Sequence, residues 1–294
     1  MTTIVLACGD RAHDLVGALL PGSVSLPATP GRRDLRLLDE LAAAHLPQDD
    51  SPSLEEIAAQ PDVPHQGAPQ FAPQRPDQPV RVVVVGSDAA VAAVVTRLMR
   101  IDALWISVGF VPVGPGGSVV AQNWQLEASD EPDLAALNFA MTAPARPTSI
   151  VRDDAGIVTL GSAEILHPGS ELVGEVIVDS GTLFMNQSTA PWEGKAGAFG
   201  VRMVPTVEAP GLAATRLLTP SVYDEIAAEK SLRRRLFRRN LEPGLVDHTA
   251  VLSGRALQAG GVGLTVVRDG VAHPRAVKSV TFYRHLRDGQ FVRR

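Results

Sequence analysis

The sequence predicts an α/β domain with a wound, mostly parallel sheet, followed by a β-rich antiparallel domain. Strand patterns alternate with glycine-marked turns and helix patterns over residues 1–146. Short alternating strands with tight-turn signals dominate residues 147–294. The chain has 294 residues, and a prior of roughly 150 residues per domain also favours two domains.

The first elements of the predicted α/β domain are a strand and two helices. Residues 3–7 are an apolar run that ends at Cys8-Gly9-Asp10, which is typical of a buried strand followed by a turn. Asp10 is placed to cap the helix that follows. A second helix, rich in Leu and Ala, is expected over about residues 34–46.

A proline-rich stretch follows, with eight prolines from Pro47 to Pro79. Proline removes a backbone donor and restricts the residue before it, so this stretch predicts a loop. One short helix is expected near residues 53–60. The stretch is either a disordered insertion without function or a functional lid, and its composition favours the insertion.

Residues 80–85 give the clearest strand signal of the chain, because a nearly continuous run of valines suits a strand buried on both faces. A turn and a helix through residues 91–99 follow. Residues 106–113 are a further apolar segment, and a helix is expected to start within residues 119–126. This alternation of strand, glycine turn and helix predicts the wound sheet.

The second half of the chain carries strand signals with one helical interruption. Strands are expected within residues 150–160, 174–178 and 277–283. Asp269-Gly270 favours a tight hairpin turn inside residues 262–271. A helix is expected over about residues 221–240.

The first candidate site is the turn Gly86-Ser87-Asp88, which follows the valine-rich strand. Ligands of open α/β sheets bind at the carboxyl ends of the strands, and a glycine lets backbone approach a phosphate. Asp88 either positions a metal-bound nucleotide or caps the helix that begins at Ala89, and the local sequence favours the cap.

The second candidate site is the turn that contains Gly114, Gly116, Gly117 and Ser118. Such a glycine-rich turn is either a phosphate cradle or a tight connection without a ligand. Ser118 is placed to cap the helix that follows.

The order and spacing of the two turns resemble the diacylglycerol kinase family, which is related in fold to sphingosine kinases and NAD kinases. That family carries Gly-Gly-Asp-Gly-Thr after a Val/Ile-rich strand, and a Pro-Leu-Gly-Thr-Gly-Asn-Asp segment some twenty-five residues later. The counterparts here are residues 86–90 and 112–122. The likeness is clearest over residues 80–126, and residues 254–285 resemble the C-terminal part of actinobacterial members.

The resemblance implies ATP and Mg²⁺ as cofactors, and transfer of the γ-phosphoryl group to a lipid hydroxyl. It implies that Asp88 organises the metal and the phosphates, and it does not locate the catalytic acid. The residues that it places at the nucleotide are Gly86, Ser87, Asp88, Gly114, Gly116, Gly117 and Ser118.

The two turns depart from the family pattern at several positions. Ser87 and Ala89 stand at two family glycines, and Ala90 stands at the threonine. Gly117-Ser118 replaces the Asn-Asp pair, so only Asp88, Gly114 and Gly116 carry over. These changes favour a second hypothesis, a catalytically inactive relative that binds a ligand or regulates. A third hypothesis is an NAD kinase-like enzyme. The lack of a recognisable Asn-Glu pair counts against it.

A basic stretch over residues 230–239 includes Arg233, Arg234 and Arg238. It is either a contact with anionic lipid headgroups or a solvated helix paired within the protein, and the second is favoured. The net charge of −5 gives no global attraction to nucleic acid. The family resemblance implies a nucleotide as a partner and leaves a lipid partner open, nucleic acid is not expected, and homo-oligomers remain open.

The remaining composition points to a cytoplasmic protein. The N-terminus lacks the features of a secretory signal, and no run approaches the roughly 18 apolar residues that span a bilayer. The single cysteine, Cys8, is expected to be an inert core thiol in a reducing compartment. The histidines do not pair at metal-ligand spacing.

Overall fold

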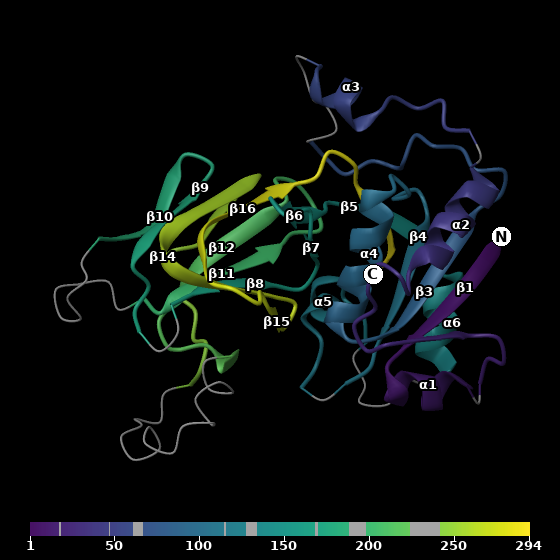
Figure 1. Cartoon of the computed structure of the whole chain (residues 1–294), viewed down its shortest axis with the longest axis horizontal. Coiled ribbons are helices and arrows are strands. Elements are labelled where there is room, and N and C mark those ends of the chain that lie inside the picture. The colour runs from purple at the N-terminus through teal and green to yellow at the C-terminus, as the bar shows by residue number, and fades with distance from the viewer. Residues whose placement is uncertain are drawn as a thin grey trace. The chain divides into compact units, whose positions relative to one another are not determined.

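The computed structural model shows two compact units, which we call the α/β unit and the β unit (Figure 1). It describes residues 1–17, 19–46, 48–60, 67–114, 116–127, 134–167, 170–187, 198–223 and 242–294. The α/β unit comprises Met1–Gly161, Pro205–Pro210 and Arg284–Arg294, and the β unit comprises Ser162–Val204 and Gly211–Tyr283. The end of the chain therefore belongs to the same unit as its beginning.

The α/β unit contains a six-stranded sheet with strand order β2-β1-β3-β4-β17-β5. Strands β2, β1, β3, β4 and β17 run parallel to one another, and β5 at the edge is antiparallel to β17. This arrangement confirms the predicted mostly parallel sheet. In strand order, the bounds are Val24–Leu26, Thr2–Cys8, Val80–Gly86, Ser107–Pro112, Gly289–Val292 and Ala145–Thr148.

Helices cover both faces of this sheet, because alternate residues of the central strands point to opposite sides. On one face, Leu6 and Val84 share a core with helices α2 (Arg36–His45), α4 (Asp88–Arg100) and α5 (Val119–Asn123). On the other, Val5 and Val85 pack with helices α1 (Asp10–Gly17) and α6 (Leu134–Thr142). Every residue of β3 is buried, as its continuous run of valines predicts.

The described part of the proline-rich stretch is a loop with one short helix, α3 (Leu54–Ala58), as predicted. A capping box starts this helix: the Glu56 amide donates to the Ser53 hydroxyl oxygen, and the Ser53 amide donates to the Glu56 carboxylate. Residues 67–79 form hydrogen bonds with Arg284–Arg294, which we call the C-terminal segment.

The β unit is built from antiparallel pairs, which confirms the predicted class of the second half. Strand β8 pairs with β11 and β14, β9 with β10 and β14, β12 with β13, and β14 also with β15 and β16. From β8 to β16 the bounds are Ala163–Leu166, Gly174–Val178, Gly181–Asn186, Gly200–Pro205, Leu212–Leu217, Leu252–Gly254, Ala256–Arg268, Val271–Ala272 and Val277–Arg284.

The second half of the sequence carries two local predictions, a hairpin turn and a helix, and the described residues test only the turn. Asp269 and Gly270 connect β14 to β15 with φ angles of 47° and 80°, so both have the positive φ that a two-residue type I′ hairpin requires. The predicted hairpin turn is confirmed. The helix expected over residues 221–240 lies mostly outside the described residues, as do Arg233, Arg234 and Arg238.

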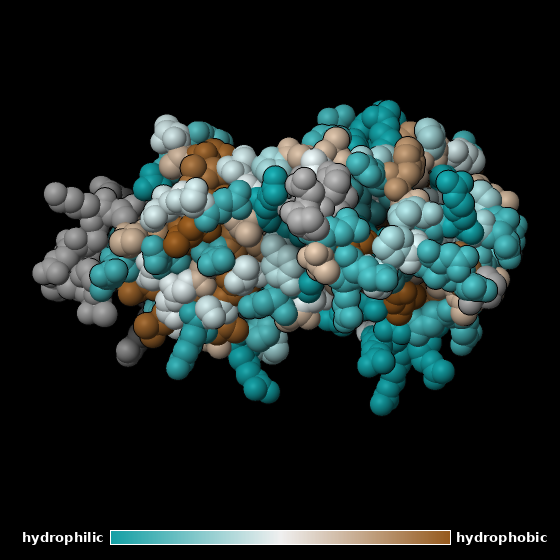
Figure 2. All heavy atoms as spheres, turned by 90° about the horizontal axis from the view of Figure 1, so that it is seen from above, coloured by the Kyte–Doolittle hydropathy of each residue, from teal (hydrophilic) through white to brown (hydrophobic). Residues whose placement is uncertain are grey.

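A short hairpin, β6 (Val151–Asp153) and β7 (Val158–Thr159), completes the strands of the α/β unit. On the face seen in Figure 2, hydrophilic and apolar residues are mixed. No helix within the described residues combines the length and the apolar character needed to cross a bilayer.

Candidate ligand site at the carboxyl edge of the parallel sheet

The two glycine-marked turns of the sequence lie at the same edge of the parallel sheet. Strand β3 lies between β1 and β4, and Gly86 at its end is in register with Pro112 at the end of β4. The Val113 amide donates a 2.8 Å hydrogen bond to the Gly86 carbonyl oxygen. The turn after β1, at Gly9, opens at this edge too, because β1 and β3 are parallel. The carboxyl ends of three neighbouring strands thus meet there, as the wound sheet implies.

Asp88 does not cap its own helix, so that prediction is wrong. The N-cap of α4 is Ser87, which has extended backbone and accepts a 3.3 Å hydrogen bond from the Ala90 amide. Asp88 is already the first residue of α4. Its side chain is therefore free to turn away from the helix that carries it.

The Asp88 carboxylate caps the other helix, α5. Oδ2 accepts hydrogen bonds from the amides of Val119, at 2.8 Å, and Val120, at 3.3 Å. Oδ1 accepts a hydrogen bond from the hydroxyl of Ser118. Both carboxylate oxygens are thus engaged by donors at the start of α5, where the free amides of a helix favour negative charge.

Ser118 is the N-cap of α5, as predicted from the sequence. Its hydroxyl oxygen accepts a 2.9 Å hydrogen bond from the Ala121 amide while its proton is donated to Asp88. The side chain is almost fully buried. Ser118 and Asp88 together fasten the turn after β3 to the turn after β4.

The glycines of the second turn are there for their backbone conformation. Gly114, Gly116 and Gly117 have φ angles of 148°, 93° and 80°, and an added Cβ at any of them meets nothing within 4 Å. Among the described residues, the amides of Gly116 and Gly117 meet no hydrogen-bond acceptor. This turn is open enough to offer backbone donors to an oxygen-rich ligand.

Gly86 is a glycine for a different reason. An added Cβ would lie 2.9 Å from the Cβ of Cys8 and 3.2 Å from the carbonyl oxygen of Cys8. The glycine thus allows β1 and β3 to approach closely at their ends. Cys8 itself is buried, and burial raises the pKa of its thiol to about 12, which keeps it protonated at neutral pH.

The residues at this edge do not fit a magnesium ion held by Asp88. A metal would have to displace the Ser118 hydroxyl and the amides of Val119 and Val120 from the carboxylate, and α5 would lose its cap. Within the described residues, no group of three or more His, Cys, Asp and Glu side chains is placed to hold a metal ion.

Asp88→Ala is expected to lower the free energy of unfolding of the ligand-free protein by about 1–2 kcal/mol, because the two amides and the Ser118 hydroxyl lose their acceptor. Urea unfolding measures this loss. Asp154→Ala, which removes an exposed acid of the same unit, is the control and should change little. Equal stability of the two variants would contradict the capping role of Asp88.

Sequence reasoning missed the contact between Asp88 and α5. The two partners are thirty or more positions apart, and no motif links an aspartate after one strand to the helix after the next. The only signal was the parallel order of the two strands, which predicts that their carboxyl ends meet at one edge.

The fold defined by these two units is that of the diacylglycerol kinases. A diacylglycerol kinase from Bacillus anthracis str. Sterne superimposes with a TM-score of 0.53 at 10% identity, covering 100% of this chain and 97% of that chain. A presumed diacylglycerol kinase from the same organism gives 0.54 at 9% identity, covering 99% and 98%. At such low identities the likeness shows the fold alone.

A weaker likeness, with a TM-score of 0.41 at 12% identity, is to an NAD kinase from Archaeoglobus fulgidus in complex with ATP, covering 100% of this chain and 94% of that chain. No protein-family model and no curated protein matches the sequence.

Proposed function

We propose that this protein is a catalytically inactive relative of the diacylglycerol kinases that acts as a ligand-binding or regulatory protein. The observation that carries this proposal is the engagement of both Asp88 oxygens by the start of α5. The carboxylate that the family resemblance assigns to the metal and phosphates serves here as an internal helix cap.

The other polar side chains of the two turns support the same proposal. Ser87 caps α4 and Ser118 caps α5, so their oxygens are also bound to the protein's own backbone. Phosphoryl transfer needs a metal that neutralises charge, groups that cradle the phosphates, and a base. Ser87, Asp88 and Ser118, the polar side chains of the two glycine-marked turns, hold these turns and their helices together.

ATP-dependent phosphorylation of a lipid hydroxyl is the second candidate function. It is favoured by the open turn with Gly114, Gly116 and Gly117, whose backbone could receive phosphate oxygens. In this case Asp88 would have to leave α5 to meet Mg²⁺. No feature of the described residues favours the NAD kinase-like alternative.

The partners and location remain predictions. Lipid contact through Arg233, Arg234 and Arg238 rests on sequence alone, since these residues lie outside the described ones. A cytoplasmic location and homo-oligomerisation are likewise predictions from the sequence alone.

Titration of the purified protein with Mg·ATP by calorimetry distinguishes the two candidates. The inactive relative is expected to give no binding heat at millimolar ATP. Binding tighter than about 1 mM, roughly −4 kcal/mol, that is lost in Asp88→Ala and kept in Asp154→Ala would overturn the proposal in favour of the kinase.

A further inference from the structure

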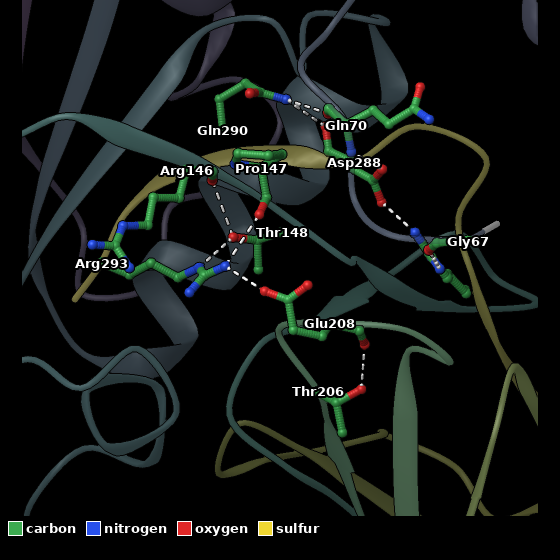
Figure 3. A network of polar contacts seen from close by, with 11 residues as sticks. Gly67, Gln70, Arg146, Pro147, Thr148, Thr206, Glu208, Asp288, Gln290 and Arg293 are labelled. Carbon is green, nitrogen blue, oxygen red and sulfur yellow. Dashed lines mark hydrogen bonds and ion pairs between the residues drawn. The ribbon is translucent and has the colours of Figure 1, made fainter. Parts of the chain in front are cut away.

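The strap, residues 67–79 between α3 and β3, is held by polar side chains of the C-terminal segment (Figure 3). The Gln70 amide donates a 2.9 Å hydrogen bond to Asp288 Oδ2, and Gln290 Nε2 donates to the Gln70 carbonyl at 3.4 Å. Arg284 Nη1 donates a 2.7 Å hydrogen bond to the Gly67 carbonyl. The strap is therefore fastened through its backbone.

Two of the side chains that fasten it, Arg284 and Asp288, form a buried ion pair. The second half of the strap has hydrogen bonds of its own, from the Asp77 amide to the His45 carbonyl at 3.1 Å and from Gln74 Nε2 to Asp49 at 3.3 Å. Arg284 Nη2 lies 3.0 Å from Asp288 Oδ1, and the two side chains are 0% and 3% exposed. Burial raises the pKa of Asp288, an effect that the hydrogen bonds from the Gln70 amide and from Arg284 partly offset. The strap thus supplies one of the hydrogen bonds that oppose the rise in the pKa of this carboxyl group.

The C-terminal segment is itself firmly placed. Arg293 donates from Nε to the Thr148 hydroxyl at 2.9 Å and pairs with Glu208 at 3.0 Å (Figure 3). Strand β17, which follows Asp288, is hydrogen-bonded between β4 and β5. When the contacts between strap and segment break, the strap is therefore the part that moves.

Apolar burial holds the strap only weakly. Among its residues, Ala72 packs against the core of the α/β unit, whereas Phe71 is 69% exposed and Pro73 and Arg75 are exposed. Segments with few buried apolar contacts open locally at a lower free energy than the global unfolding of the domain.

We propose that the strap is a releasable element that opens as a unit while the parallel sheet stays folded, with Asp288 as the residue that holds it closed. Residues 285–288 also form the connection along which the chain passes from β16 to β17. Opening would free this connection from the strap.

Hydrogen exchange measured by NMR tests the proposal through two amides. The Gln70 amide reports on the strap, and the Val83 amide in the buried strand β3 reports on global unfolding. In the wild-type protein, Gln70 is expected to exchange at least tenfold faster than Val83 and with a weaker dependence on urea. Equal rates with equal urea dependence would mean that the strap opens only when the unit unfolds, and would overturn the proposal.

Variants then test the role of Asp288. Asp288→Asn is expected to speed exchange at Gln70 at least tenfold, and by more than it speeds exchange at Val83. Gln290→Met removes the donor to the Gln70 carbonyl, together with a 3.2 Å hydrogen bond to the Asp288 carbonyl, and leaves the Asp288 carboxylate in place. It should act in the same direction by about threefold and covers a failure of Asp288→Asn to fold. Glu127→Gln, an exposed acid paired with Arg294, is the control. If neither Asp288→Asn nor Gln290→Met sped exchange at Gln70 more than at Val83, Asp288 would not be the residue that holds the strap closed.

Discussion

Arg284→Met is expected to lower the free energy of unfolding of the α/β unit by about 3–5 kcal/mol, because it leaves the buried carboxyl group of Asp288 without its ionic partner. The loss would appear in urea unfolding followed by the fluorescence of Trp105 and Trp124, both buried in the core of this unit. A Trp192→Phe background removes the third tryptophan from the signal.

Two further variants separate the charge from the packing. The double variant Arg284→Met/Asp288→Leu removes both charges and should recover most of the lost stability, since a buried pair can often be replaced by apolar side chains at little cost. Arg294→Met breaks a pair whose side chains are 50% and 78% exposed, and should cost about 1 kcal/mol or less. If Arg284→Met cost no more than Arg294→Met, burial would not be what makes this pair important.

Gly174→Ala is expected to destabilise the β unit by about 2–5 kcal/mol, through backbone strain and overpacking together. Gly174 opens β9 with a φ of 152°, which side-chain-bearing residues rarely adopt. An added Cβ would lie 2.2 Å from the carbonyl oxygen of Gly260 on β14, and neither backbone can move without disturbing the pairing of the two strands. Thermal unfolding followed by circular dichroism measures the effect.

Gly260→Ala is the matched control for this prediction. The Cβ of an alanine at position 174 would collide with the carbonyl oxygen of Gly260. By contrast, a Cβ added at position 260 meets nothing within 4 Å. The variant should fold with nearly unchanged stability. If the Gly174→Ala protein were as stable as the Gly260→Ala protein, β9 and β14 would not be tightly packed where they pair at Gly174.

The sequence alone predicts the class of the fold because the signals are local. A run of valines from Val80 to Val85 specifies a strand buried on both faces, and glycine turns with helix patterns after it specify a wound sheet. Asp269-Gly270 specifies its hairpin, and Ser118 specifies the start of α5, since each depends on the backbone of a few neighbouring residues.

The tertiary structure alone decided which partners these residues meet. The residues around Asp88 predict either a cap for α4 or a metal ligand. The parallel strands instead place Asp88 beside α5, where it accepts hydrogen bonds from the free amides of that helix. Gln70 reads as part of a structureless loop, but the last strand brings Asp288 to its amide. These contacts join residues far apart in the chain, so their energies depend on strand order and burial, which no local pattern encodes.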